Sequence, residues 1–209
     1  MSATFHPYPH VPKVYPPGKP AGAATQHVPV LIVGGGPVGL ATALGLARHG
    51  VPSVLIEADD GVCTGSRAIC ISRRSLEIIE RLGALDGFLA KGLPWAGGRS
   101  FYREEEVLHF SMPQDANQKL PPMVNLAQYH IEQFLLDAAE RLPELIDIRW
   151  QTKVTCVDRR ADGASVTVTT PEDTYQIDTD WLVAADGGRS AVREALGLKL
   201  QCTSYEGRY

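Results

Sequence analysis

The apolar positions of the first sixty residues predict a strand, a helix and a second strand in succession. Residues 30–33 form a continuous apolar run, which is typical of a strand buried on both faces of a parallel sheet. From Pro37 to His49 the residues leave hardly any polar face, so we expect a helix enclosed by neighbouring elements and ended by Gly50. Residues 53–57 predict the next strand. This order is a β-α-β unit.

Helical and alternating patterns divide the middle of the chain. Leu76, Ile79, Leu82 and Leu85 are spaced three apart, with Ser72 or Ser75 as the expected N-cap; a second amphipathic stripe covers residues 131–142. Between these two helical segments, residues 99–103 and 107–111 alternate and predict a β-hairpin outside the parallel sheet.

The last third of the chain reads as strands. Residues 145–150 predict a strand that returns to the parallel sheet, and residues 153–159, 165–170 and 174–178 predict an antiparallel meander, expected to be scaffold without chemistry. An apolar strand then begins at Trp181, and a turn and a helix capped by Ser190 follow it. The pattern indicates an α/β fold, with a Rossmann-like parallel sheet and a β-meander.

A glycine-rich turn joins the first predicted strand to its helix. Gly34, Gly36 and Gly39 form G-x-G-x-x-G, which suits a tight turn, close backbone approach to a pyrophosphate and close helix packing, and Pro37 suits the first helical turn. Glu57 follows at about the 20-residue separation of an acid that binds an adenosine ribose. The alternative is an ordinary β-α-β unit with a surface glutamate. A dinucleotide site with this acid would disfavour the 2′-phosphate of NADP, so FAD or NAD is expected.

A second turn repeats this pattern near the end of the chain. Asp186 and Gly187 follow the last predicted strand, where the carboxylate is placed to accept a hydrogen bond from a ribityl or ribose hydroxyl. A capping aspartate in a strand-turn-helix corner is the alternative. Arg67, in the loop after the second strand, is a candidate partner for the pyrophosphate or the flavin edge, or else a loop arginine bonded to backbone carbonyls.

Composition and charge narrow the classes of function. The 209 residues are 44% hydrophobic with a net charge of -4, which gives no basic surface for nucleic acid or an anionic membrane. No segment is apolar for long enough to span a bilayer, and no metal site is expected. The four cysteines lack C-x-x-C spacing, so we expect reduced thiols in a cytoplasmic protein. The proline-rich residues 1–27 are expected to be a disordered arm outside the core.

Three separated motifs together resemble the single-component flavoprotein aromatic hydroxylases. They are residues 33–40 (VGGGPVGL), 66–83 (SRAICISRRSLEIIERLG) and 183–193 (VAADGGRSAVR). The likeness covers residues 28–209 and is strongest to the branch acting on phenols and 3-(3-hydroxyphenyl)propionate, which is related to para-hydroxybenzoate hydroxylase. It implies a FAD-binding domain in which residues 95–122 begin a substrate-binding layer.

The resemblance also implies a reaction and roles for individual residues. FAD would be reduced by NAD(P)H and would use O2 to hydroxylate an activated aromatic ring. An acid like Glu57 would contact the ribose, an arginine like Arg67 the diphosphate, and a glutamine like Gln128 the cofactor. Asp186 and Gly187 would serve both FAD and NAD(P)H, and Arg193 the nicotinamide nucleotide. The sequence leaves open whether the protein forms a homo-oligomer.

The end of the chain departs from that family. Its members continue through most of the substrate sheet to a second flavin motif, glycine-aspartate, and no such pair follows Gly197 here. We therefore expect an N-terminal portion, a truncated gene product or a partial record, which binds FAD weakly and does not turn over by itself. An NAD-dependent dehydrogenase and a non-catalytic nucleotide-binding fragment are the alternative functions.

Overall fold

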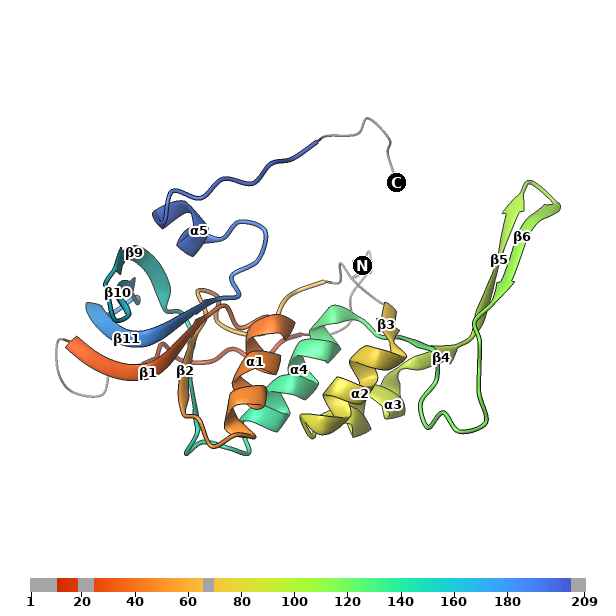
Figure 1. Ribbon diagram of the computed structural model, residues 1–209, viewed down its shortest axis with the longest axis horizontal. Coiled ribbons are helices and arrows are strands. Elements are labelled where there is room, and N and C mark those ends of the chain that lie inside the picture. The colour runs from red at the N-terminus through yellow and green to blue at the C-terminus, as the bar shows by residue number, and fades with distance from the viewer. Residues whose placement is uncertain (1–10, 19–24, 66–69, 204–209) are drawn as a thin grey trace, which may run out of the picture.

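The computed structural model describes residues 11–18, 25–65 and 70–203. Within these ranges a six-stranded sheet has the order β8-β2-β1-β11-β10-β9, and helices pack beside it (Figure 1). The architecture is mixed α/β, as the sequence predicts.

The parallel half of the sheet is built around β1 (Thr25–Val33). It pairs in parallel with β2 (Ser53–Ile56) and with β11 (Thr174–Ala184), and β2 pairs in parallel with β8 (Ile146–Arg149). Leu31 and Ile32 point to opposite faces of β1, and both are 0% exposed. The prediction of a strand buried on both faces is therefore confirmed.

The other half of the sheet is the antiparallel meander of β9 (Lys153–Arg159), β10 (Ala164–Thr169) and β11. The sequence suggested two strands, residues 174–178 and another from Trp181; that division is wrong, because β11 runs through both without a break. Thr179, at the junction, is paired with Val28 on one side and with Ala164 on the other. One continuous strand therefore joins the meander to the parallel sheet.

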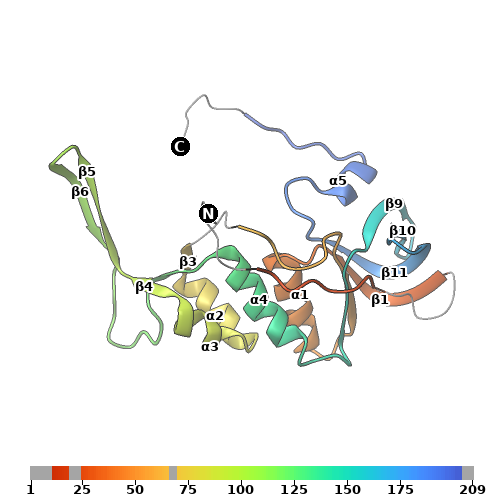
Figure 2. The same cartoon turned by 180° about the vertical axis from the view of Figure 1, so that it is seen from behind.

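Two hydrophobic clusters cover the two faces of the sheet. On one face Ile32 and Leu55 pack with residues of α1 (Pro37–Ala47) and α4 (Gln128–Ala139). On the other face, Leu31 and Ile56 pack with apolar residues of β9, β10 and α5 (Ala191–Ala195). Figures 1 and 2 show α1 and α4 side by side, with α2 (Arg73–Arg81) and α3 (Leu85–Lys91) beyond them.

Helix α1 ends as the glycine predicts but is less enclosed than expected. Gly50 has φ +70°, and the amides of Gly50 and Val51 donate to carbonyls of Ala47 and Leu46 at 2.9 and 3.1 Å, the pattern of a Schellman motif. Val38, however, is 66% exposed. The helix packs against the sheet and against α4, and Val38 is the one residue of the helix that is exposed.

The helical periodicity over residues 76–85 belongs to two helices. Ser72 caps α2, as expected, by accepting a hydrogen bond from the Ser75 amide at 3.3 Å. Gly83 has φ +77°, a conformation that L side chains rarely adopt, and the chain turns there before α3 begins. The three-residue spacing of apolar side chains therefore continues across the turn that separates the two helices.

Two small antiparallel sheets lie beyond the helices. One has the order β3 (Cys70–Ser72), β7 (Met123–Asn125), β4 (Leu93–Trp95). The other is the predicted hairpin, β5 (Gly97–Tyr102) with β6 (Glu105–Ser111), which projects away from the rest of the protein in both views (Figures 1 and 2). All of β6 is exposed, and Leu108 is 53% accessible to solvent.

Residues 11–18 contradict the expectation of a disordered arm. Tyr15 is buried and stacks on Trp150 with ring centroids 4.9 Å apart, and Pro17 forms a parallel bridge to the same tryptophan. The Tyr15 amide donates to the carbonyl of Asp60 at 2.8 Å. The prolines keep the segment extended, and the aromatic contact anchors it along the sheet edge next to β8. Residues 1–10 and 19–24 lie outside the described ranges.

Tyr15→Ala is expected to lower the free energy of unfolding by about 2 kcal/mol, because it removes a buried aromatic ring and its stacking partner. Urea denaturation of the purified chain measures this. Val14 is 67% exposed, so Val14→Ala is a matched control expected to stay within about 0.5 kcal/mol of wild type. Equal stability of the two variants would mean that the segment contributes nothing to the fold.

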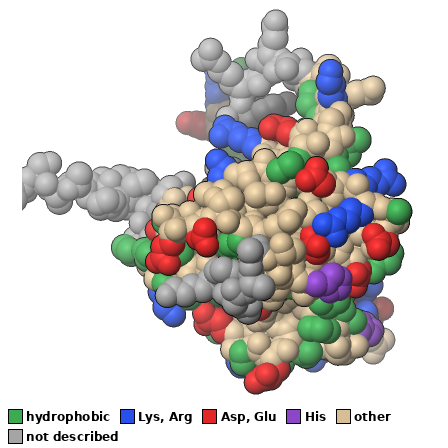
Figure 3. Space-filling model, turned by 90° about the vertical axis from the view of Figure 1, so that its left-hand side faces the viewer, with side chains coloured by type: hydrophobic (Ala, Val, Ile, Leu, Met, Phe, Trp, Pro, Cys, Tyr) green, Lys and Arg blue, Asp and Glu red, His purple; other side chains and the backbone are tan. Residues whose placement is uncertain are grey.

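On the face shown in Figure 3, acidic and basic side chains are interspersed. Among the described residues, no helix combines the length and the apolar character needed to cross a bilayer.

Candidate functional site

A cavity of about 470 Å³ lies where the carboxyl ends of β1, β2 and β11 meet the beginning of α1. Ligands of open α/β sheets bind at this kind of position, outside the carboxyl ends of the strands. The cavity brings together most of the residues that the sequence singled out: Gly34, Gly36, Pro37, Glu57, Gln128, Asp186 and Gly187.

Each of the three glycines of the first turn is explained by a different feature of its surroundings. Gly34 has φ +110°, and a Cβ there would lie 2.4 Å from the carbonyl oxygen of Ala185. A Cβ on Gly39 would lie 1.8 Å from the carbonyl oxygen of Gly34, so glycine lets the helix approach the turn. Gly36 is different, because a Cβ there meets no protein atom within 4 Å and would enter the cavity.

The N-terminus of α1 opens onto this cavity. Gly36 is its N-cap and Pro37 its first residue, and no side chain caps the helix. Amides of the first turn have no partner within a helix, and the helix dipole favours negative charge at this end. The arrangement suits the diphosphate of a dinucleotide.

Glu57 stands at the end of β2 with both carboxylate oxygens engaged. Oε2 accepts a hydrogen bond from the Gly35 amide, and Oε1 accepts one from the Asp59 amide at 3.0 Å. A carboxylate has about four acceptor positions, so capacity for a ligand hydroxyl remains. Glu57 therefore supports the glycine turn as well as lining the cavity.

The second turn supplies an acid with one unsatisfied oxygen. Asp186 Oδ2 accepts a hydrogen bond from the Val192 amide at 3.1 Å, so the residue does cap α5. Its Oδ1 is buried and finds no partner among the described residues. A buried acceptor of this kind calls for a donor from a ligand or water. Together with the open Gly36 position, it fits a cofactor that carries hydroxyl and diphosphate groups.

The arginines of this region are placed differently from one another. Arg189 lines the cavity, whereas Arg193 is not among the lining residues. The Arg193 guanidinium donates to the carbonyl of Gly188 at 3.0 Å. Arg67 falls in residues 66–69, outside the described ranges.

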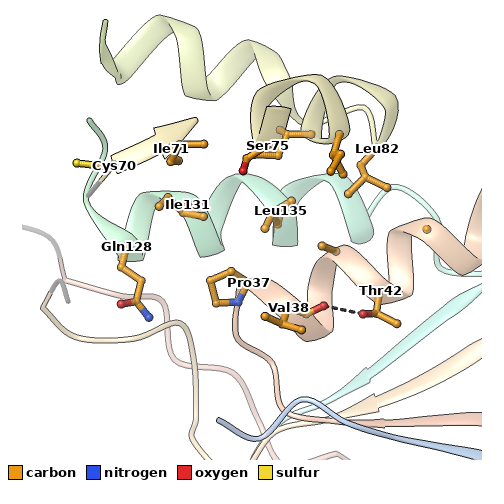
Figure 4. Close-up of a pocket in the computed structure, with 14 residues that line it drawn as sticks. Pro37, Val38, Thr42, Cys70, Ile71, Ser75, Leu82, Gln128, Ile131 and Leu135 are labelled. Carbon is orange, nitrogen blue, oxygen red and sulfur yellow. Dashed lines mark hydrogen bonds between the residues drawn. The ribbon is translucent and has the colours of Figure 1, made fainter. Parts of the chain in front are cut away.

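Gln128 is the first residue of α4 and lies between two hollows. It lines the cavity described above and also an apolar groove of about 720 Å³ along α1, α2 and α4. Figure 4 shows its side chain at the end of α4, on the side of Pro37, with Val38 and Thr42 following along α1. The exposed Val38 of α1 lines this groove.

The residues of the cavity that were not predicted include one on α4 and three around the start of β9. Glu132, Thr152, Lys153 and Val154 line the cavity. We expected the meander to be scaffold only, but the beginning of β9 borders the site because the Thr152 amide donates to the carbonyl of Glu57 at 2.7 Å. Glu132 follows Gln128 by four positions, a spacing that places both on one side of a helix; this was the available sequence signal.

Comparison with known proteins agrees with this geometry. Residues 27–208 match the family described as FAD binding domain. The chain is 32% identical to a para-nitrophenol 4-monooxygenase of Pseudomonas sp., over 86% of this chain and 45% of the relative. It is 28% identical to a 3-(3-hydroxy-phenyl)propionate/3-hydroxycinnamic acid hydroxylase of Mycolicibacterium smegmatis, over 87% of this chain and 32% of the relative.

A solved structure gives the same picture. The crystal structure of a p-nitrophenol 4-monooxygenase from Pseudomonas putida superposes with a TM-score of 0.79 and 28% identity, covering 86% of this chain and 46% of that one. The chain thus spans less than half the length of these relatives. The comparisons give no support to the dehydrogenase alternative.

Proposed function

Because the chain belongs to the FAD binding domain family, we propose that residues 28–209 hold the FAD of an NAD(P)H-dependent monooxygenase that hydroxylates phenolic compounds. The observation that carries the proposal is the open turn at Gly36, which faces the cavity at the uncapped N-terminus of α1. The relatives named above act on a nitrophenol and on hydroxyphenyl acids, which supports a phenolic substrate and O2 as the partners.

In this proposal each lining residue has a defined task. Backbone amides at the start of α1 bind the diphosphate, and Pro37 sets the first turn of that helix. Glu57 accepts a hydrogen bond from the adenosine ribose, and Asp186 Oδ1 accepts one from a cofactor hydroxyl. Gln128 contacts the cofactor from α4. Arg67 and Arg193 keep the roles that the resemblance implies, at the diphosphate and at the nicotinamide nucleotide.

Bound FAD would supply the electron transfer and the oxygen chemistry. The protein's part is to orient the cofactor and to exclude water from its reactive end. The described cavity surrounds the glycine turn, which serves the ADP end of the cofactor.

We also propose that residues 95–122 begin a substrate-binding layer. An isolated two-stranded hairpin is marginally stable in water, and β5–β6 exposes Phe101 at 58% and Leu108 at 53%. Such a hairpin is expected to pair with further strands.

Four free cysteines support a cytoplasmic location for the protein.

Glu57→Ala is expected to weaken FAD binding by about 1.5 to 3 kcal/mol, because the ribose loses a charged acceptor and the Gly35 amide loses its partner. Isothermal titration calorimetry measures the loss. Asp60→Ala, three residues along the same loop and exposed, is the control. Unchanged affinity in Glu57→Ala would mean that Glu57 is a surface glutamate that does not bind the ribose.

A chimera tests the proposed activity. Residues 27–208 replace the matching part of the Pseudomonas para-nitrophenol 4-monooxygenase, and NAD(P)H oxidation is followed with and without a phenol. The expected result is a FAD-loaded chimera whose oxidation is stimulated by the phenol and coupled to hydroxylated product, whereas the 209-residue chain alone shows none. A folded, FAD-loaded chimera without phenol-dependent oxidation would refute the proposed activity.

A further inference from the structure

We propose that Glu132 is a positioning residue of the cofactor site, which holds the Gln128 amide in one orientation and anchors the loop that follows Glu57. The inference rests on the proposed FAD site and adds to it a residue that neither the motifs nor the resemblance indicated. It predicts that Glu132 governs FAD affinity through Gln128.

Glu132 is a buried carboxylate with a separate donor at each oxygen. Its side chain is on α4, is 3% exposed and lines the cavity. Oε1 accepts a hydrogen bond from Gln128 Nε2 at 2.9 Å, and Oε2 accepts one from the Cys63 amide at 2.7 Å. Buried charged groups are costly unless they are hydrogen-bonded, and these two bonds offset part of that cost.

The first bond determines which end of the Gln128 amide faces Glu132. An ionised carboxylate only accepts hydrogen bonds, whereas a glutamine side chain carries a donor end and an acceptor end. The amide nitrogen of Gln128 must therefore face Glu132, and the amide oxygen points away from it. A cofactor beside Gln128 then meets one fixed arrangement of donor and acceptor.

The second bond ties α4 to the loop between two candidate cofactor residues. Cys63 lies after Glu57, whose carboxylate supports the glycine turn, and four positions before Arg67 in the sequence. The contact uses the Cys63 backbone, so it does not depend on the thiol. Glu132 thus connects the helix that carries Gln128 with the loop that leads from the ribose acid.

The negative charge of Glu132 and its positioning role have opposite expected effects on FAD affinity. A carboxylate that lines a cavity for an anionic cofactor repels the diphosphate, so removing its charge would strengthen binding if repulsion were its main effect. A positioning role predicts weaker binding when the charge is removed. The sign of the change therefore separates the two.

The test is FAD titration of the full 209-residue chain in a double-mutant cycle. Glu132→Gln keeps the size and an acceptor for Cys63 but presents a donor to Gln128; it is expected to weaken FAD binding about tenfold. Glu132→Asp keeps the charge, falls short of Gln128 and is expected to weaken binding as well. In the Gln128→Ala background, Glu132→Gln should change the affinity by about twofold or less.

A matched pair on the same helix serves as the control. Gln133 Nε2 donates to Asp137 Oδ1 at 2.7 Å with the same four-residue spacing, but on the exposed side of α4. Asp137→Asn is expected to change FAD affinity by about twofold or less. Hydrogen exchange of the Cys63 amide without FAD reports on the loop contact; protection should persist in Glu132→Gln and be lost in Glu132→Ala.

The outcomes separate this inference from the proposed function. Wild-type chain that does not bind FAD overturns both. FAD binding that is tighter in Glu132→Gln, or an effect of Glu132→Gln that is the same with and without Gln128, overturns the positioning role and leaves the FAD site intact. Unaltered exchange of Cys63 in Glu132→Ala refutes the anchoring of the loop.

Discussion

Gly36→Val is expected to leave the chain folded and to weaken FAD binding by at least about 100-fold. Gly36 has φ -73° and ψ -176°, which a valine adopts without strain, and a Cβ there meets no protein atom within 4 Å. The added side chain would instead occupy the cavity at the N-terminus of α1, where the diphosphate has to meet the backbone amides.

Circular dichroism and urea denaturation check the fold of the Gly36→Val chain, and calorimetric titration with FAD checks its affinity. FAD also stabilises a chain that binds it, so saturating cofactor should raise the midpoint of thermal unfolding of wild type but not of the variant. A folded variant with wild-type affinity would show that the diphosphate does not lie at this turn.

Gly39→Ala, three residues further along the same motif, is expected to act on the fold instead. A Cβ at Gly39 would lie 1.8 Å from the carbonyl oxygen of Gly34, a backbone atom in the turn that joins β1 to α1. Neither atom has room to move without separating the helix from the strand. We expect the free energy of unfolding to fall by more than about 4 kcal/mol, or the chain to be recovered unfolded.

Gly45→Ala is the matched control for this change, because it adds the same methyl group to the same helix. A Cβ at Gly45 meets nothing within 4 Å, and alanine favours the helix over glycine by about 1 kcal/mol, so the variant should be as stable as wild type or more stable. Urea denaturation compares the three chains. A Gly39→Ala chain as stable as the Gly45→Ala chain would show that the helix does not pack against the turn as described.

Sequence patterns predicted the first unit of this fold because the residues that determine it lie close together in the chain. The apolar strand β1, the glycine turn and α1 are consecutive, so each reports its conformation through its own residues. The same holds for the Ser72 and Ser190 caps, whose hydroxyls accept from amides three residues later. The ends of β1, β2 and β11 then meet at one edge of the sheet, which brings Gly36, Glu57 and Asp186 together.

The features that the sequence missed depend on contacts between distant segments. Tyr15 is buried because Trp150 offers a ring to stack on, and no pattern within a proline-rich arm signals such a partner. The continuity of β11 depends on its pairing with β1 and with β10 at once. The second oxygen of Glu132 accepts a hydrogen bond from the Cys63 amide, which is 69 residues away in the sequence.

Competition for FAD tests the central claim most directly, which is that this chain holds the ADP end of FAD at the Gly36 turn. The 209-residue chain is titrated with FAD, and the bound flavin is then challenged with ADP, which carries the adenosine and the diphosphate, or with FMN, which carries the flavin, the ribityl chain and one phosphate. We predict that FAD binds, that ADP displaces it, and that FMN does not. Failure of FAD to bind, or displacement by FMN but not by ADP, would contradict the account.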